Sequence, residues 1–416
     1  MTSNRRDFLK TSAVAAGATL LSSVVNHAYA DGGETLRVGV IGCGGRGSGA
    51  AENCLEGTTG TKIVAAGDVY KGHATALRKK LAKFGDRVDL PDERCFDGLD
   101  NYEKVLAAGI DLVILATPPG FRPGHLEAAV AAGKHIFTEK PVAVDPAGIR
   151  KVLAAAEESK KKNLAVVAGT QRRHQTGYLE TLKRIHDGAI GDILNAHCYW
   201  NNAGIWFRQR QKFMSDAEYQ INNWYHFLWV CGDHICEQHI HNLDVINWAM
   251  QAHPVSCWGL GGRQGRKVGD PNEVGNIYDH FAIEYTYPNG AISNSFCKHL
   301  PGADNVSELL IGTKGKCQVN DYRINGERVL QGRDNAPYVQ EHTDLVASIR
   351  AGKPLNELVQ VAESTMTAIM GRMAAYTGEI VTWDDAMNSP LDTFPKKLSW
   401  DMSLQVGPVP VPGRKA

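Results

Sequence analysis

Short apolar runs alternate with helical patterns between residues 36 and 168, and no other feature constrains the fold as strongly. Runs that predict strands and patterns that predict helices follow one another in the order 36–41, 47–55, 63–67, 73–83, 112–116, 125–132, 135–138, 146–161 and 164–168. Buried strands separated by helices of this length are typical of βαβ units. The sequence therefore predicts an α/β domain with a parallel, doubly wound sheet.

The pattern changes after Thr170, where alternating segments replace the βαβ order. A helix at 178–186 precedes predicted strands at 193–200, 255–260, 277–287, 291–299 and 306–311, and helices near 338–351 and 358–376 precede a strand at 380–383. Turns at 288–290 and 312–315 join three of these strands as antiparallel neighbours. We therefore expect a second, α+β domain with a large, mainly antiparallel sheet. The tail from Gly407 has three prolines in its first six residues and is expected to be a loose arm.

The first thirty residues carry the features of an export signal. Arg5 and Arg6 stand in the run N-R-R-D-F-L-K, a short stretch of small apolar residues follows, and Ala28-Tyr29-Ala30 fits an A-x-A cleavage site. Paired arginines before such a stretch are typical of the twin-arginine route, and an amphipathic N-terminal helix is the alternative. We therefore predict a signal peptide at 1–30, a periplasmic location, a Rossmann-type domain at 31–170 and an α+β domain at 171–416.

The composition excludes several classes of protein. Lys and Arg total 45, Asp and Glu total 45, and no long basic block occurs. No apolar run reaches the roughly 20 residues that span a bilayer. A nucleic-acid partner and membrane insertion are therefore not expected. The nine cysteines are scattered and form no C-x-x-C pair, so neither a disulfide framework nor a zinc ribbon is indicated.

A G-x-G-x-x-G motif lies directly after the first predicted strand and opens a helix. Its glycines allow a tight turn, close approach of a pyrophosphate and packing of helix on strand, and the helix N-terminus favours the phosphates. Asp68 ends the second strand, about 20 residues further on, where a carboxylate bonds the adenosine ribose and repels a 2′-phosphate. The predicted cofactor residues here are Gly42, Gly44, Gly45, Arg46, Gly47 and Asp68. NAD is the expected cofactor, although Arg46 and Lys71 leave NADP open.

A second motif spans the fourth predicted strand, where residues 133–141 read G-K-H-I-F-T-E-K-P. Together with the glycine motif and the Thr117-Pro118 pair, this run resembles the glucose–fructose oxidoreductase, inositol dehydrogenase and rhizopine-catabolism (Gfo/Idh/MocA) family. The resemblance covers about residues 36–385 and includes the run G-R-M-A-A-Y-T-G-E-I-V from residue 371. It implies that Thr117, Pro118, Glu139 and Lys140 belong to the cofactor site. It also implies that Lys140 reaches the reacting hydroxyl beside the nicotinamide.

The resemblance further implies an acid-x-x-x-His pair in the second domain, matched here by Glu237 and His241. Dehydrogenases of the family usually carry Asp where this chain has Glu237, which leaves its exact role open. Residues four apart share one face of a helix, so we expect the carboxylate to orient the imidazole, which takes a hydroxyl proton. Lys140 supplies positive charge where alkoxide character develops. The predicted catalytic residues are therefore Lys140, His241 and Glu237.

Polar residues beside these motifs are candidates for substrate binding. Four of them follow the last strand of the first domain, where ligands of open α/β sheets collect. The candidates are Gln171, Arg172, Arg173, His174, His239 and Asp244. His234 and His239 cluster near Glu237 without a standard metal spacing, so hydrogen bonding is the expected role and no metal site is predicted. Sugar stacking and core packing both remain open for Trp200, Trp206, Trp224 and Tyr225.

The export signal bears on the reaction. Free NAD is not expected outside the cytoplasm, so we expect a tightly bound cofactor that survives many turnovers. Hydride then moves between this cofactor and a hydroxyl carbon of a sugar, polyol or sugar derivative. Redox-neutral glycoside cleavage through transient oxidation and elimination is the alternative, although family members with that activity carry Tyr-x-x-His in place of residues 237–241. A non-catalytic binding protein is a third interpretation. The resemblance also implies a homo-oligomer.

Overall fold

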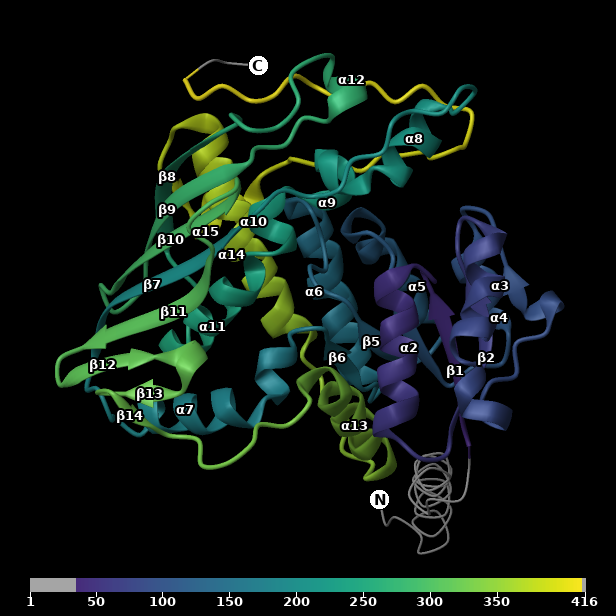
Figure 1. Ribbon diagram of the computed structural model, residues 1–416, viewed down its shortest axis with the longest axis horizontal. Helices are drawn as coiled ribbons and strands as arrows, with labels where there is room; N and C mark the ends of the chain where they lie inside the picture. Colours follow the sequence, from purple (N-terminus) through teal and green to yellow (C-terminus); the bar gives the residue numbers. More distant parts are fainter. Residues whose placement is uncertain (1–34, 414–416) are drawn as a thin grey trace, which may run out of the picture.

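The computed structural model describes residues 35–413, so the predicted signal peptide at 1–30 lies outside the described residues. The first sheet has the strand order β3-β2-β1-β4-β5-β6, and every neighbouring pair runs parallel. Its strands are β1 (Leu36–Ile41), β2 (Thr61–Gly67), β3 (Cys95–Phe96), β4 (Leu112–Leu115), β5 (His135–Thr138) and β6 (Val166–Ala168). The predicted parallel, doubly wound sheet is confirmed (Figure 1).

Helices pack on both faces of this sheet and form one apolar core on each. They are α2 (Gly45–Gly57), α3 (Lys71–Lys80), α4 (Asn101–Ala107), α5 (Arg122–Ala131) and α6 (Pro146–Lys161). α6 begins where the Asp145 side chain accepts a hydrogen bond from the Gly148 N–H, with Pro146 in the first turn. The sequence did not predict β3 and α4, because such short elements show too little of an apolar period.

The second sheet has nine strands in the order β14-β13-β12-β11-β7-β10-β9-β8-β15. They are β7 (Ile193–Asn202), β8 (Ser256–Gly262), β9 (His280–Thr286), β10 (Ile292–His299), β11 (Asn305–Gly312), β12 (Gly315–Gln318), β13 (Arg323–Ile324), β14 (Glu327–Arg328) and β15 (Val381–Thr382). All neighbours run antiparallel except β7 and β10, so the expected mainly antiparallel sheet is confirmed. The 288–290 turn joins β9 to β10 as predicted. The 312–315 turn instead joins β11 to the short β12, and β11 pairs along β7.

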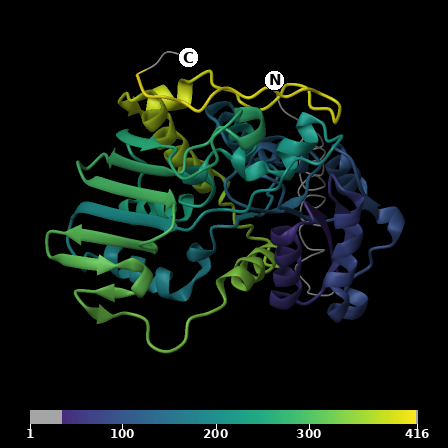
Figure 2. The ribbon, with the colours of Figure 1, turned by 45° about the horizontal axis from the view of Figure 1, so that its top comes forward.

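Helices lie on one face of the second sheet and leave the other face uncovered (Figure 2). The helices after residue 175 are α7 (Thr176–His186), α8 (Asp216–Asn222), α9 (Leu228–Cys231), α10 (His234–Glu237), α11 (Ile240–Met250), α12 (Pro271–Val274), α13 (Pro337–Arg350), α14 (Leu358–Thr377) and α15 (Trp383–Asn388). Two of them return to the first domain. Leu345 and Ile349 of α13 enter one core of the parallel sheet, and Leu358 and Val361 of α14 enter the other. None of the helices in residues 35–413 is long and apolar enough to cross a membrane.

The tail after Gly407 is tied to the second domain, which corrects the expectation of a loose arm. The Asn276 side chain donates to the Gly407 carbonyl over 3.3 Å, and the Tyr278 hydroxyl donates to the Pro410 carbonyl over 2.9 Å. Proline lacks an N–H donor but keeps its carbonyl acceptor, so a proline-rich tail can still be anchored.

All nine cysteines are buried and have free thiols. Burial raises the pKa of the Cys54 and Cys236 thiols to about 12. The reactive thiolate form is therefore suppressed, and these residues serve as small apolar side chains of the core.

Candidate active and cofactor site

The glycine motif forms a tight turn between β1 and α2. Gly42 has a φ of +89°, and a Cβ there would lie 2.7 Å from the backbone that follows β4. A Cβ on Gly47 would lie 1.7 Å from the Gly42 carbonyl oxygen, so only glycine lets the helix start this close to the strand. In contrast, a Cβ on Gly44 or Gly45 would meet nothing within 4 Å. The backbone at these two residues therefore borders open space.

Asp68 lies directly after β2, beside the glycine turn. Its Oδ2 accepts a hydrogen bond from the Cys43 N–H over 2.8 Å, and its Oδ1 accepts one from the Tyr70 N–H over 3.0 Å. The Nδ1 of His73 lies 3.1 Å from the same Oδ1. These contacts hold the carboxylate next to the space at Gly44. The glycines, the start of α2 and Asp68 thus have the arrangement that can bind the pyrophosphate and adenosine ribose of a dinucleotide.

Arg46, in the first turn of α2, points toward the carboxyl end of β5. Its guanidinium pairs with Glu139, lies 3.3 Å from Glu341 Oε1 of α13, and stands 5.0 Å from the centre of the Tyr338 ring. Asp68 is not among its partners. Arg46 therefore belongs to the Glu139 end of the site.

Thr117 and Pro118 follow β4 and lead into a short helical turn, η3 (Pro119–Phe121). The buried Arg122 donates to the Thr117 carbonyl and, over 2.5 Å, to the Glu139 carbonyl. Burial lowers the pKa of Arg122 to about 10, so its charge persists at neutral pH. Arg122 thereby fixes the loops after β4 and β5 against each other at the sheet edge.

Lys140 follows the end of β5 and reaches the second domain. Its Nζ donates to the main-chain carbonyl of Glu237 over 2.6 Å and lies 3.3 Å from Glu237 Oε1. The two side chains are only 9% and 11% exposed. The other carboxylate oxygen of Glu237, Oε2, is buried and has no partner among the described residues. A buried polar atom of this kind is costly unless a ligand or water meets it, so it marks a place for a polar ligand.

His241 is buried beside this pair, and its ring stacks on the Trp200 indole with centroids 5.6 Å apart. Burial holds the pKa of His241 well below its usual value, and the positive charges of Lys140, Arg172 and Arg46 lower it further. The imidazole is therefore neutral at neutral pH and able to accept a proton.

Glu237 and His241 do not share one continuous helix, which corrects the expectation from their spacing. α10 ends at Glu237, residues 238–239 form a break, and α11 begins after it. Glu237 pairs with Lys140, and within residues 35–413 no hydrogen bond joins Glu237 to His241. The i, i+4 spacing places two side chains on one face only where the helix is uninterrupted.

A strained turn at Asp233, just before α10, places Glu237. Asp233 has a φ of +76°, which non-glycine residues rarely adopt, and it is completely buried. Its carboxylate accepts a hydrogen bond from the Tyr376 hydroxyl of α14, and Arg372 of α14 donates to the Gly232 carbonyl over 2.6 Å. The sequence contains no local signal for this role, because the partners lie about 140 residues apart along the chain. Only the run 371–381, noted for its resemblance, pointed to this part of α14.

The substrate candidates that follow β6 form a short helical turn, η4 (Gln171–His174), and their side chains diverge. Arg172 is buried and pairs with Glu308 of β11. Burial raises the pKa of Glu308, while the Arg172 charge and hydrogen bonds oppose that shift. Gln171 donates to the Tyr338 hydroxyl over 3.2 Å, and its buried Oε1 has no partner in the described part of the chain.

His174 connects η4 to α13 and to the start of α14. Its Nδ1 lies 2.7 Å from Asp344 Oδ2, and its Nε2 lies 3.2 Å from Glu357 Oε1. Burial by itself lowers the pKa of His174, but these two carboxylates raise it to about 10. His174 is therefore charged at neutral pH and committed to two structural partners.

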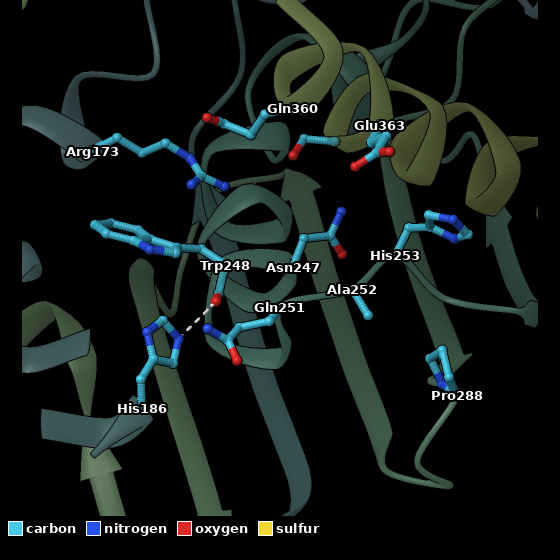
Figure 3. A pocket seen from close by; sticks show the side chains of 11 residues that line it. Arg173, His186, Asn247, Trp248, Gln251, Ala252, His253, Pro288, Gln360 and Glu363 are labelled. Atoms are coloured by element: carbon cyan, nitrogen blue, oxygen red, sulfur yellow. Dashed lines mark hydrogen bonds between the residues drawn. The ribbon is translucent and has the colours of Figure 1, made fainter. Parts of the chain in front are cut away.

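Arg173 and Asp244, two further substrate candidates, bind each other. Arg173 donates to both oxygens of Asp244 over 2.9 and 3.0 Å, and Asp244 also accepts from Gln360 over 3.2 Å. Arg173 lines a surface pocket together with Trp248 and Gln360 (Figure 3). This pocket borders the last turns of α11, whereas His241 lies in its first turn. The structure thus places this pair beside a pocket separate from the Lys140–Glu237 contact.

His239 lies inside the second domain without exposed surface. Its Nε2 is 2.7 Å from the Ser295 hydroxyl of β10, and burial lowers the pKa of His239 to about 3. The His234 ring contacts the His299 ring at a tilt of 39°, with centroids 3.6 Å apart. In residues 35–413 no three His, Cys, Asp or Glu side chains are arranged to hold a metal ion.

Comparison with known proteins gives a family match for the first domain and a match for the signal sequence. Residues 36–167 match the model of the oxidoreductase family with an NAD-binding Rossmann fold, GFO_IDH_MocA, and residues 2–22 match the twin-arginine translocation signal sequence. Inositol 2-dehydrogenase 1 from Saccharopolyspora erythraea is 30% identical over 194 residues, which cover 46% of this chain and 54% of that protein. The chain spans about half the length of the curated relatives it matches.

Solved structures match over a larger share of the chain. An oxidoreductase from Thermotoga maritima has a TM-score of 0.65 at 21% identity and covers 85% of this chain and 100% of its own. The aldose–aldose oxidoreductase from Caulobacter crescentus, complexed with glycerol, has a TM-score of 0.64 at 18% identity and covers 84% of this chain and 100% of its own. These likenesses show that both domains share the fold of those proteins. With the family match over residues 36–167, the first domain of this chain belongs to the Gfo/Idh/MocA family of oxidoreductases, which have an NAD-binding Rossmann fold.

Proposed function

We propose that this protein is an NAD(P)-dependent oxidoreductase that acts on a CH–OH group of a sugar, polyol or sugar derivative. The observation that carries the proposal is the meeting of Lys140, Glu237 and the neutral His241 at the carboxyl edge of the parallel sheet. Ligands of open α/β sheets bind at this edge. A bound NAD would supply the acceptor for the hydride that leaves the hydroxyl carbon.

His241 takes the hydroxyl proton, because its imidazole is neutral and can accept one. Lys140 stabilises the negative charge that develops on the hydroxyl oxygen. Glu237 positions Lys140 through its main-chain carbonyl and Oε1, and its free Oε2 is available to a substrate hydroxyl. The charge of Arg172 helps to keep His241 unprotonated.

The proposed cofactor is NAD, tightly held. The residues that would hold it are Gly42, Gly44, Gly45, Arg46, Gly47, Asp68, Thr117, Pro118, Glu139 and Lys140. Asp68 supports NAD over NADP, because a carboxylate in this position repels a 2′-phosphate and Arg46 is engaged with Glu139 instead. The twin-arginine match supports tight retention and a periplasmic location, since an exported enzyme cannot draw on cytoplasmic NAD.

A polyol or sugar as substrate is supported by the names of similar proteins, inositol 2-dehydrogenase and aldose–aldose oxidoreductase. The second name describes an oxidoreductase that acts between two aldoses. Two buried polar atoms without partners in the described residues, Gln171 Oε1 and Trp200 Nε1, support a ligand rich in hydroxyls. Arg173, His174 and Asp244 already have charged partners and support the site indirectly.

The test begins with residues 31–416, purified from the cytoplasm and denatured in acid. Near-stoichiometric release of NAD is expected, followed by reduction of the bound cofactor when a panel that includes myo-inositol and glucose is added. Protein that lacks NAD and binds it weakly would contradict cofactor retention. Release of an aglycone without net cofactor reduction would instead indicate redox-neutral glycoside cleavage. Saturable NAD binding without activity on any sugar or polyol would indicate a binding protein.

We also propose that the protein is a homo-oligomer formed through the outer face of the second sheet. Helices leave this face uncovered (Figure 2), and Trp258, Leu260 and Phe296 on it are 50%, 65% and 37% exposed. Exposed apolar patches of this kind mark protein contacts. Leu260→Glu is expected to convert the oligomer to a monomer in light scattering. A monomeric unsubstituted protein would contradict this proposal.

A further inference from the structure

The C-terminal arm, residues 389–406, leaves α15 and runs across the top of the molecule toward α8 (Figure 1). We propose that this arm is part of the cofactor site, where it covers the adenosine end and slows the release of NAD. The inference rests on the proposed NAD binding. It concerns the rate at which the cofactor leaves rather than the reaction.

The arm packs on residues that follow two strands of the parallel sheet. Tyr70 stands two residues after Asp68, and Phe121 ends the turn after β4. The Trp400 ring of the arm lies 6.1 Å from the Tyr70 ring, and the Phe394 ring lies 5.3 Å from the Phe121 ring. In a sheet of this kind the adenosine lies beside the acidic residue that ends the second strand. The arm therefore stands over that part of the site.

The same arm is fastened to both domains. The Ser403 hydroxyl and the Leu404 N–H donate to Asp216 Oδ2 of α8 over 2.9 and 3.1 Å. Nearer its start, the N–H and hydroxyl of Thr393 both donate to Asp145 Oδ2, at the start of α6, over 2.7 Å. The arm therefore bridges the two domains, and these anchors must open before the arm can lift from the Tyr70 end of the site.

One polar atom under the arm points to a ligand. The Tyr70 hydroxyl is buried and has no hydrogen-bond partner among the described residues. Burial raises the pKa of Tyr70 to about 12, so the hydroxyl is protonated and able to donate. A buried hydroxyl without a partner, two residues from Asp68, fits the polar edge of adenosine.

The experiment measures how fast NAD leaves residues 31–416 loaded with NAD, with an excess of an NAD-consuming enzyme present to trap the released cofactor. Trp400→Ala and Phe394→Ala are compared with Lys397→Ala, which changes an exposed side chain of the same arm. The two aromatic substitutions are expected to raise the release rate at least about tenfold, because affinity changes appear mainly in dissociation. Lys397→Ala is expected to leave the rate unchanged. Wild-type release rates in the folded aromatic variants would overturn the proposal.

Thermal unfolding identifies any variant that fails to fold. Asp216→Ala then replaces it, because this change removes an anchor of the arm without touching the aromatic contacts. Asp216→Ala is expected to raise the rate of NAD release, as the aromatic substitutions do. If the unsubstituted protein binds no added NAD, the proposed function itself fails. If it binds NAD and every folded variant releases it at the wild-type rate, only the role of the arm fails.

Discussion

The two sides of the site are built in different ways. On the first-domain side, the glycine turn, Asp68 and Glu139 stand at strand ends, so their places follow from the local order of the chain. On the second-domain side, buried charges are placed by partners from distant elements, as Glu237 is by Lys140 and Arg172 by Glu308. The first side therefore depends on backbone geometry. The second side depends on buried ion pairs, and removing either member of such a pair lowers the stability of the fold.

The largest effect is expected where the second side performs chemistry. His241→Asn removes the proposed proton acceptor, so kcat should fall about 1000-fold on the sugar found by the panel. Cofactor content after acid release should stay unchanged, because no cofactor contact is proposed for His241. His186→Asn, a histidine in the separate pocket of Figure 3, is the matched control. A wild-type kcat in His241→Asn would remove this residue from the mechanism.

Gly47→Ala tests whether NAD binding on the first-domain side depends on the geometry of the glycine turn. The added Cβ would lie 1.7 Å from the Gly42 carbonyl oxygen, so the turn must shift and the Kd for NAD should rise about 100-fold or more. Gly124→Ala, in α5, meets nothing within 4 Å and should bind NAD normally. Isothermal titration with NAD measures both. Equal affinities in the two variants would show that the turn is not the phosphate site.

A smaller effect is expected for the carboxylate at the end of β2. Asp68→Ala removes the ribose acceptor and the repulsion of a 2′-phosphate, so NAD should bind about tenfold more weakly while binding of NADP improves. Titration with each nucleotide gives the ratio of the Kd for NAD to the Kd for NADP. Asp97→Ala, an exposed aspartate after β3, serves as the control. An unchanged ratio would mean that Asp68 does not set cofactor preference.

The smallest effect concerns stability. The folded pKa of His174 is about 10, above the unfolded value of about 6.5, so its charge stabilises the fold fully below pH 6.5. This contribution is lost as pH rises from about 6.5 toward 10. The Tm difference between wild type and His174→Asn should therefore shrink by about 3 °C or more between pH 6 and pH 9. A difference that stays constant with pH would contradict the assigned ion pairs.

The same contrast explains what the sequence could predict. Strand and helix periods are local, so the alternation of strands and helices in the first domain could be predicted, and α6 has the predicted bounds of 146–161. The break at 238–239 and the mutual pairing of Arg173 with Asp244 depend on which faces meet in three dimensions. The anchored tail was missed for the same reason, because proline content describes the chain but not the partners of its carbonyls.

The nine buried thiols bear on when this chain folds relative to its transport. A twin-arginine signal belongs to a route for folded cargo, and the bacterial periplasm is an oxidising compartment. An unfolded chain arriving there would present nine thiols for random pairing, whereas the folded chain presents buried cysteines with suppressed thiolates. Folding before export would therefore protect the chain chemically, because buried thiols cannot pair at random in an oxidising compartment.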